Sequence, residues 1–132
     1  MTLVDSNVLF DLLTDDPRWA SWSSMQLDRL AVTGPLVIND VVYAELSVGF
    51  DAIEELDRVL SSMRIRRVPT PAYSLFLAGK AYRQYRAAAG ARQSLLPDFF
   101  IGAHAASTRI PLLTRDPRRY RSYFPAVTLI TP

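Results

Sequence analysis

The nine residues TLVDSNVLF, from Thr2 to Phe10, constrain the fold more strongly than any other stretch of the sequence. Leu3 and Val4 form a short apolar run that ends directly at Asp5, and apolar spacing typical of a helix follows. This pattern predicts a buried strand that ends in a carboxylate and leads at once into a helix. In open α/β sheets, ligands bind beyond the carboxyl ends of the strands. Asp5 is therefore either a helix cap or the first residue of a site.

The same alternation of short apolar runs and helix-like segments continues along the sequence. Strands that alternate with helices, and that are short and continuously apolar, predict an α/β fold in which helices cover both faces of a mostly parallel sheet. Strands are expected over residues 3–4, 36–38, 65–68 (an edge strand), 112–114 and 127–130. Helices are expected over 6–13, 18 to about 32, 41–48, 52–63, 72–89 and 97–107, a polar loop over 90–94, and an irregular arginine-rich loop or single turn over 115–124.

The composition is that of an ordinary globular chain. A length of 132 residues predicts one domain over residues 1–132. No apolar run approaches the ~20 residues that span a bilayer, and the start lacks a basic segment typical of a signal peptide. We therefore expect a cytoplasmic protein with no membrane partner, and the absence of cysteine agrees with that compartment.

The residue inventory also excludes some chemistry. The sequence holds one histidine, His104, and no cysteine, so a structural zinc site built from these residues is excluded. A hydrolase with this inventory would depend on carboxylates or on water bound to a metal ion. The net charge is +2, and nearly all the basic residues are arginines, which favours slightly a nucleic-acid partner.

Glu45 is the most informative acidic residue. On a helical wheel it lies within about 60° of Val41, Val42 and Val48, so the pattern places a glutamate in the middle of the apolar face of its helix. Acidic side chains are almost never buried unless they are paired or bound to a cation. The alternative is a glutamate at the margin of this face that reaches solvent.

Two further acids have both a structural and a functional interpretation. Asp98 begins the helix expected over 97–107, where a carboxylate stabilises the helix dipole, and its face of small residues would allow a close neighbour. Asp116 follows the strand at 112–114 and precedes Pro117, so it forms either an ordinary Asp-Pro turn or an acid at the end of a strand, like Asp5.

Taken together, the four acids predict a cation site. In a doubly wound sheet Asp5, Glu45, Asp98 and Asp116 could all reach one cleft at the carboxyl edge. Like charges about 4 Å apart repel by about 4 kcal/mol per pair at an effective dielectric constant of 20, so such a cluster must take up protons or bind a cation. Ligands that are all oxygens favour Mg²⁺ or Mn²⁺, which assist phosphoryl chemistry by activating water and binding phosphate oxygens.

The sequence resembles the PIN-domain ribonucleases, in particular the VapC-type toxins of bacterial toxin–antitoxin pairs. Four segments carry the resemblance, namely VDSNVL at 4–9, the lone acid in VVYAEL at 41–46, LPDFFIGAHA at 96–105 and LLTRDPRRY at 112–120. The resemblance implies a three-layer α/β/α sandwich with strand order 3-2-1-4-5. It also implies RNA cleavage that depends on Mg²⁺ or Mn²⁺, a homodimer, and a cognate antitoxin that blocks the cleft.

The resemblance assigns roles to particular residues. Asp5, Glu45, Asp98 and Asp116 match the metal-binding acids of the family, and Asn7 and Thr114 match polar positions that support the site. In the mechanism we expect, Asp5, Asp98 and Asp116 hold one or two divalent ions, and Glu45 is a further ligand or orients the attacking water. The residues expected to contact the RNA backbone are Arg83, Arg86, Arg92, Arg115, Arg118 and Arg119, each of which could equally be a solvated surface residue.

Three further aromatic residues lie in or near these motifs. His104 lies away from the Asp98 face of its helix and is interpreted as a packing or surface residue. Tyr120 and Tyr123 either stack on unpaired bases or pack in the core.

Other function classes fit the sequence less well or remain open. A phosphotransfer receiver domain would need a lysine at a late strand end, and a haloacid-dehalogenase-type phosphatase would need an aspartate where Asn7 stands. A PIN-like module that binds RNA or protein without cleaving remains an alternative. So does a housekeeping PIN nuclease without an antitoxin.

Overall fold

The computed structural model describes residues 1–89 and 96–132. A five-stranded sheet lies at its centre, with all neighbouring strands parallel and with the order β3-β2-β1-β4-β5. The strands are β1 (Thr2–Val4), β2 (Leu36–Ile38), β3 (Ile65–Arg67), β4 (Leu112–Leu113) and β5 (Leu129–Ile130). The strand order and the parallel pairing confirm the α/β/α sandwich expected from the sequence, with β3 at an edge.

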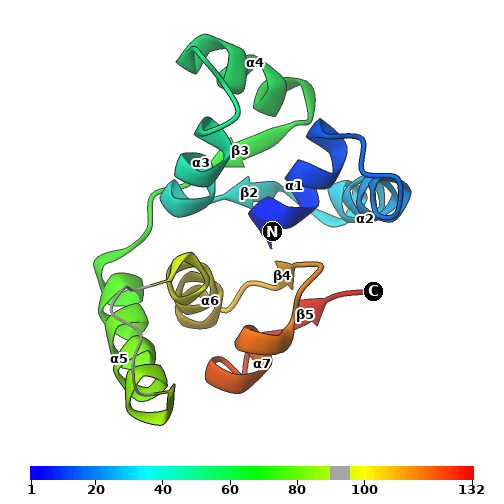
Figure 1. Ribbon diagram of the computed structural model, residues 1–132. Helices are drawn as coiled ribbons and strands as arrows, with labels where there is room; N and C mark the ends of the chain where they lie inside the picture. The colour runs from blue at the N-terminus through cyan, green and yellow to red at the C-terminus, as the bar shows by residue number, and fades with distance from the viewer. Residues whose placement is uncertain (90–95) are drawn as a thin grey trace.

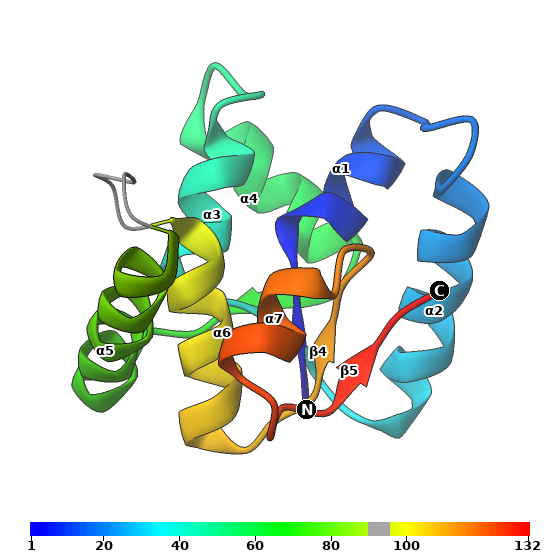
Figure 2. The same ribbon diagram turned by 60° about the horizontal axis from the view of Figure 1, so that its bottom comes forward.

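Helices cover both faces of the sheet. Those in the described residues are α1 (Ser6–Leu13), α2 (Ala20–Thr33), α3 (Asp40–Ser47), α4 (Ile53–Ser62), α5 (Ala72–Ala89), α6 (Pro97–Thr108) and α7 (Arg118–Tyr123). Figures 1 and 2 show α5, α6 and α7 together on one side of the sheet and α2 on the other. The β1–β2 and β3–β4 connections therefore place their helices on opposite faces.

The central strands are buried because they lie between these helix layers. Leu3, Val4, Val37, Leu112 and Leu113 are fully buried, as the continuously apolar runs predict for a parallel sheet. By contrast, Arg66 and Arg67 on β3 are exposed, which agrees with an edge strand.

The segment over 115–124 differs from the irregular loop or single turn expected from the sequence. The structure has a six-residue helix, α7, which Pro117 precedes at the N-cap position. Tyr120 and Phe124 lie four residues apart on one side of this segment, and both are buried. This spacing anchors the helix to the core, and the arginines between them hid the periodicity.

The packed side of one helix differs from what apolar spacing alone would indicate. The large apolar residues Leu75 and Phe76 of α5 would be expected on its packed side, but both are exposed, and the buried side carries Ser74, Ala78 and Ala81. Small residues on that side allow α5 to pack closely against α6.

The polar loop expected over 90–94 lies outside the described residues. In the part of the chain that the structure describes, no helix combines the length and the apolar character needed to cross a membrane.

Candidate active site

Asp5 lies where β1 ends and α1 begins. Its backbone N–H donates to the Leu113 carbonyl over 2.9 Å, so the pairing of β1 with β4 continues as far as this residue. Asp5 occupies the N-cap position of α1, but its side chain makes no capping hydrogen bond. Its carboxylate is therefore free for another role, although the side chain is only 4% exposed.

Hydroxyl groups surround the Asp5 carboxylate. The Thr114 Oγ1 and Tyr120 hydroxyls each donate to Asp5 Oδ2 over 2.8 Å. The Asn7 side-chain amide donates to Thr114 Oγ1 over 3.3 Å and so supports this arrangement. The pKa of Asp5 is raised from 3.8 to about 6, mainly by burial and to a smaller extent by the charge of Asp98, against the lowering effect of these two hydroxyls.

Glu45 reaches the same region from α3. The Ser6 hydroxyl donates to Glu45 Oε1 over 3.0 Å and lies 3.5 Å from Asp5 Oδ1. Glu45 is partly buried but does not lie in the middle of an apolar face, because Val48 is 87% exposed. It borders the buried side of the helix and faces the site. Burial raises the pKa of Glu45, and the charges of Asp5 and Asp98 raise it further.

Asp98 stands in the first turn of α6, where Arg119 Nη1 donates to its Oδ2 over 2.7 Å. The pair forms because α7 packs directly against α6. Gly102 permits this contact, since a Cβ at that position would lie 2.3 Å from Phe124 Cδ2. The face of small residues expected beside Asp98 thus accepts an aromatic ring.

Asp116 follows β4 and carries the most exposed of the four carboxylates. Its side chain is 54% exposed and accepts two hydrogen bonds from Arg118, from Nε over 3.1 Å and from Nη2 over 3.2 Å. Arg118 holds the pKa of Asp116 below its usual value. The Asp116 backbone N–H donates to Thr114 Oγ1, the same hydroxyl that contacts Asp5, over 3.2 Å.

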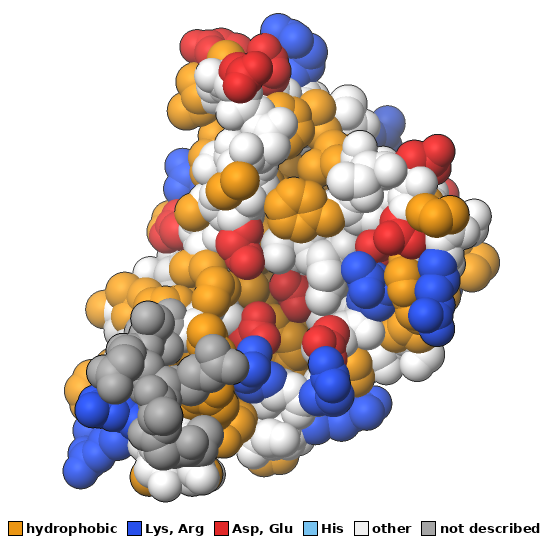
Figure 3. Space-filling view, in the orientation of Figure 1, with side chains coloured by type: hydrophobic (Ala, Val, Ile, Leu, Met, Phe, Trp, Pro, Cys, Tyr) orange, Lys and Arg blue, Asp and Glu red, His pale blue; other side chains and the backbone are white. Residues whose placement is uncertain are grey.

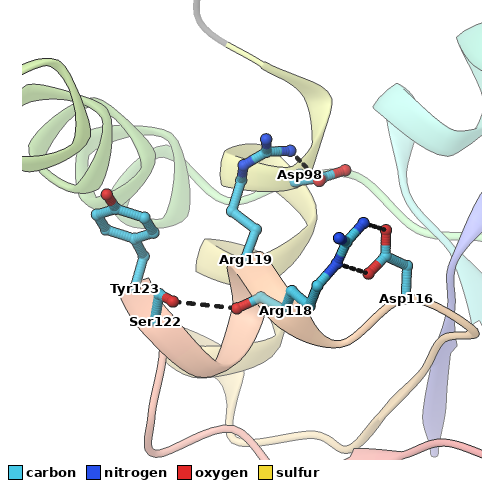
Figure 4. Close-up of a pocket in the computed structure, with 6 residues that line it drawn as sticks. All are labelled: Asp98, Asp116, Arg118, Arg119, Ser122 and Tyr123. Carbon is cyan, nitrogen blue, oxygen red and sulfur yellow. Dashed lines mark hydrogen bonds and ion pairs between the residues drawn. The ribbon is translucent and has the colours of Figure 1, made fainter. Parts of the chain in front are cut away.

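Asp98 and Asp116 line a hollow at the carboxyl edge of the sheet. Figure 3 shows acidic side chains gathered there between α3, α6 and α7, with basic side chains beside some of them. A cavity of about 350 Å³ opens next to α7, and in Figure 4 Arg118 and Arg119 point toward the two carboxylates. The residues that line it are Asp98, Asp116, Arg118, Arg119, Ser122 and Tyr123.

The structure therefore brings Asp5, Glu45 and Asp98 within electrostatic reach of one another, with Asp116 joined through Thr114. Within residues 1–89 and 96–132, no three acidic or histidine side chains are close enough together to hold one metal ion as they stand. Two guanidinium groups pair with Asp98 and Asp116, and their rotation would free both carboxylates.

The donor set fits a hard divalent cation. The acidic ligands available here are carboxylates, supported by hydroxyl groups, and such oxygen atoms suit Mg²⁺ or Mn²⁺. Burial and mutual repulsion raise the pKa values of Asp5 and Glu45, so a cation between them would relieve an unfavourable arrangement. Asp5, Glu45, Asp98 and Asp116 are the residues that would hold it.

A comparison with known protein families identifies the family of this chain. Residues 2–125 match the family model described as the PIN domain. The chain belongs to the PIN domain family. No curated protein sequence matches it at a significant level. The family resemblance inferred from the four sequence segments is thus confirmed.

Solved structures share the PIN fold along nearly the whole chain. The structure described as VapBC2 from Rickettsia felis bound to a DNA fragment from their promoter is 21% identical, with a TM-score of 0.74 and coverage of 99% of this chain and 98% of that one. A toxin–antitoxin complex from Klebsiella pneumoniae is 21% identical, with a TM-score of 0.69 and coverage of 100% and 98%. DNA-bound VapBC from Salmonella typhimurium is 18% identical, with a TM-score of 0.70 and coverage of 98% and 96%. The chain therefore belongs to the PIN domain family and shares its fold with these structures.

Apart from Arg115, the arginines expected to contact RNA fall into three groups in this PIN domain. Arg83 and Arg86 are exposed on α5, and Arg118 and Arg119 are paired with acids of the site. Arg92 lies outside the described residues.

Arg115 differs from Arg118 and Arg119 because the acid that binds its side chain, Asp11, is buried. Its Nε and Nη2 donate to the two oxygens of Asp11 over 2.9 and 2.8 Å, and the guanidinium lies 5.4 Å from the centre of the Trp19 ring. Asp11 is 2% exposed and also accepts from the Ser23 hydroxyl. The Arg115 backbone N–H donates to Asn7 Oδ1. This side chain anchors the segment before α7 to α1, which favours a structural role for Arg115 over an RNA contact.

Three residues near the PIN site make contacts that the sequence did not predict. Ser6 joins Asp5 to Glu45, Asp11 binds Arg115, and Tyr120 donates to Asp5. Of these, Asp11 left a signal in the sequence, because it interrupts an apolar helix segment just as Glu45 does. Tyr120 packs in the core, one of its two expected alternatives, and His104 is likewise buried.

Proposed function

We propose that this PIN domain, spanning residues 1–132, is a metal-dependent endoribonuclease that hydrolyses RNA phosphodiester bonds. The observation that carries the proposal is the convergence of Asp5, Glu45 and Asp98 at the carboxyl edge of the sheet, with Asp116 beside them. Repelling carboxylates that are partly buried are costly in a domain that only binds RNA. They are useful in one that holds a divalent ion.

Each acid has a defined part in this proposal. Asp5, Asp98 and Asp116 hold one or two Mg²⁺ or Mn²⁺ ions, and a bound ion supplies positive charge to the phosphodiester and to the leaving oxygen. Glu45 accepts the Ser6 hydroxyl at Oε1. This leaves Oε2 as the atom that would take a proton from the attacking water.

The proposed RNA path follows the basic residues beside the acids. Arg118 and Arg119 leave Asp116 and Asp98 when the acids bind a cation, and their guanidinium groups then pair with phosphate oxygens. Arg83 and Arg86, exposed on α5, extend this path. Contacts of this kind supply affinity rather than base preference.

We further propose that the protein is the toxin of a toxin–antitoxin pair, acts in the cytoplasm and forms a homodimer. The support is that the structures with this fold described above are toxin–antitoxin complexes. A small neighbouring gene for a DNA-binding protein, and growth arrest on induction, are expected for a toxin and not for a housekeeping nuclease. Light scattering of the purified protein would test the dimer, for which the exposed Tyr73, Leu75 and Phe76 of α5 are a candidate surface.

Cleavage of labelled RNA with Mn²⁺ or Mg²⁺, with and without EDTA, tests the enzyme directly. We expect Asp98→Asn to reduce metal-dependent cleavage on the order of 100-fold or more, because loss of a ligand removes several kcal/mol of transition-state stabilisation. Asp40→Asn is the matched control, since Asp40 is also paired with an arginine, Arg67, but lies on the surface. Full activity in folded Asp98→Asn would refute this assignment, and RNA binding without cleavage by the wild type would favour a non-cleaving module.

A further inference from the structure

Tyr120 contacts Asp5 although the two residues lie 115 positions apart in the sequence. Its hydroxyl donates to Asp5 Oδ2 over 2.8 Å, and the residue is 1% exposed. The ring is held by α7, which begins after Pro117 and packs on α6 where Gly102 leaves room for Phe124. A tyrosine that only filled space would not need to end on a carboxylate.

The two oxygens of Asp5 have different surroundings. Oδ2 accepts hydrogen bonds from Tyr120 and Thr114, both at 2.8 Å, and the Asn7 amide lies 3.5 Å away. Oδ1 meets the Ser6 hydroxyl at 3.5 Å, on the side toward Glu45. A carboxylate oxygen offers about two lone pairs, so two short hydrogen bonds occupy Oδ2 and leave Oδ1 for another ligand.

We propose that Tyr120 is a positioning residue that acts with Thr114 to fix the Asp5 carboxylate, so that Asp5 binds a divalent cation through Oδ1. This inference rests on the proposed metal-dependent function and goes beyond it by naming the ligand atom and the groups that orient it. Two donors on one oxygen restrict rotation of the carboxylate, and a ligand that is already oriented loses less entropy when it binds the ion.

Tyr120→Phe tests the hydroxyl alone, because it keeps the buried ring. The control is Tyr43→Phe, which also removes a tyrosine hydroxyl that donates to a carboxylate, in this case to Asp57 Oδ1 over 2.7 Å in an exposed contact. Isothermal titration with Mn²⁺ should give a dissociation constant about 10–100-fold weaker for Tyr120→Phe than for the wild type. Tyr43→Phe should bind Mn²⁺ as the wild type does. Thr114→Val should weaken Mn²⁺ binding in the same direction.

A second measurement separates positioning from a purely structural role. At saturating Mn²⁺, Tyr120→Phe should recover most of its RNA cleavage with an unchanged KM for RNA, since only the affinity for the ion is reduced. A structural role would instead lower the melting temperature in EDTA and leave the Mn²⁺ affinity of the folded protein unchanged.

The outcomes are distinguishable. If the wild type binds Mn²⁺ and Tyr120→Phe binds it equally well, the positioning role is overturned while the proposed function stands. If the wild type binds no Mn²⁺ and RNA cleavage does not depend on it, the proposed function fails and this inference fails with it.

Discussion

Replacement of Asp5 by asparagine should stabilise the protein in the absence of metal at neutral pH. The carboxylate is almost completely buried, and burial raises its pKa from 3.8 to about 6. Each pKa unit corresponds to 1.36 kcal/mol, so the ionised form of Asp5 costs the folded state about 3 kcal/mol. Asparagine carries no charge, and its Oδ1 can still accept from Thr114 and Tyr120.

The pH dependence has a defined sign. The pKa of Asp5 is higher in the folded state, so between about pH 4 and pH 6 the folded state binds more protons than the unfolded state. The destabilisation from Asp5 is therefore absent below pH 4, develops as the pH rises to 6, and is complete above that. At pH 8 the free energy of unfolding of the variant should exceed that of the wild type by about 3 kcal/mol. This difference should nearly vanish at pH 3.5.

Urea unfolding followed by circular dichroism, in EDTA from pH 3.5 to 8, measures this difference. Asp28→Asn on the exposed side of α2 is the control and should change the free energy of unfolding by less than about 0.5 kcal/mol. If Asp5 is a ligand of the proposed ion, saturating Mg²⁺ should raise the stability of the wild type and not that of Asp5→Asn, because a site that exists only in the folded state stabilises it on binding. The reasoning is refuted if Asp5→Asn is no more stable than the wild type at pH 8 without metal.

Two further substitutions test how α7 is held. Gly102→Ala should reduce the free energy of unfolding by about 1–3 kcal/mol, because its Cβ would overlap Phe124, whereas Gly79→Ala on the open side of α5 should be neutral or stabilising by up to about 1 kcal/mol. Arg115→Met should cost about 3–5 kcal/mol, since it leaves the buried Asp11 carboxylate without its charged partner. Urea denaturation measures both.

The expected contrast for Arg115→Met is Arg67→Met, which breaks the exposed pair with Asp40 and should cost less than about 1 kcal/mol. Equal losses for the two arginine variants would contradict an anchoring role for Arg115. Equal stability of the Gly102 and Gly79 variants would mean that α7 moves away from α6 at little cost.

The layered fold could be predicted from the sequence because it is determined mainly by the order of short apolar runs and helical segments. Each short apolar run next to a turn residue could only be a buried strand, and alternation with helices then required parallel pairing. Helix α7 was not predicted, because two buried aromatics among arginines leave no clear periodicity. The orientation of α5 was also missed, since its packed side is small and its exposed side includes Leu75 and Phe76.

The sequence predicts where each acid lies in the fold better than it predicts which arginine pairs with that acid. Asp5 and Asp116 follow strands, so their place at one sheet edge follows from topology. That Arg118 and Arg119 pair with Asp116 and Asp98 depends on where α7 docks, and no local pattern encodes that. Asp11 and Arg115 are 104 residues apart, and their pairing was likewise out of reach of sequence periodicity.

The contact between Tyr120 and Asp5 joins residues 115 positions apart. Contacts between residues so distant in sequence are slow to form, so we expect the docking of α7 to be a late step in folding. The proposed catalytic centre would then gain its last hydroxyl donor only after most of the domain has folded.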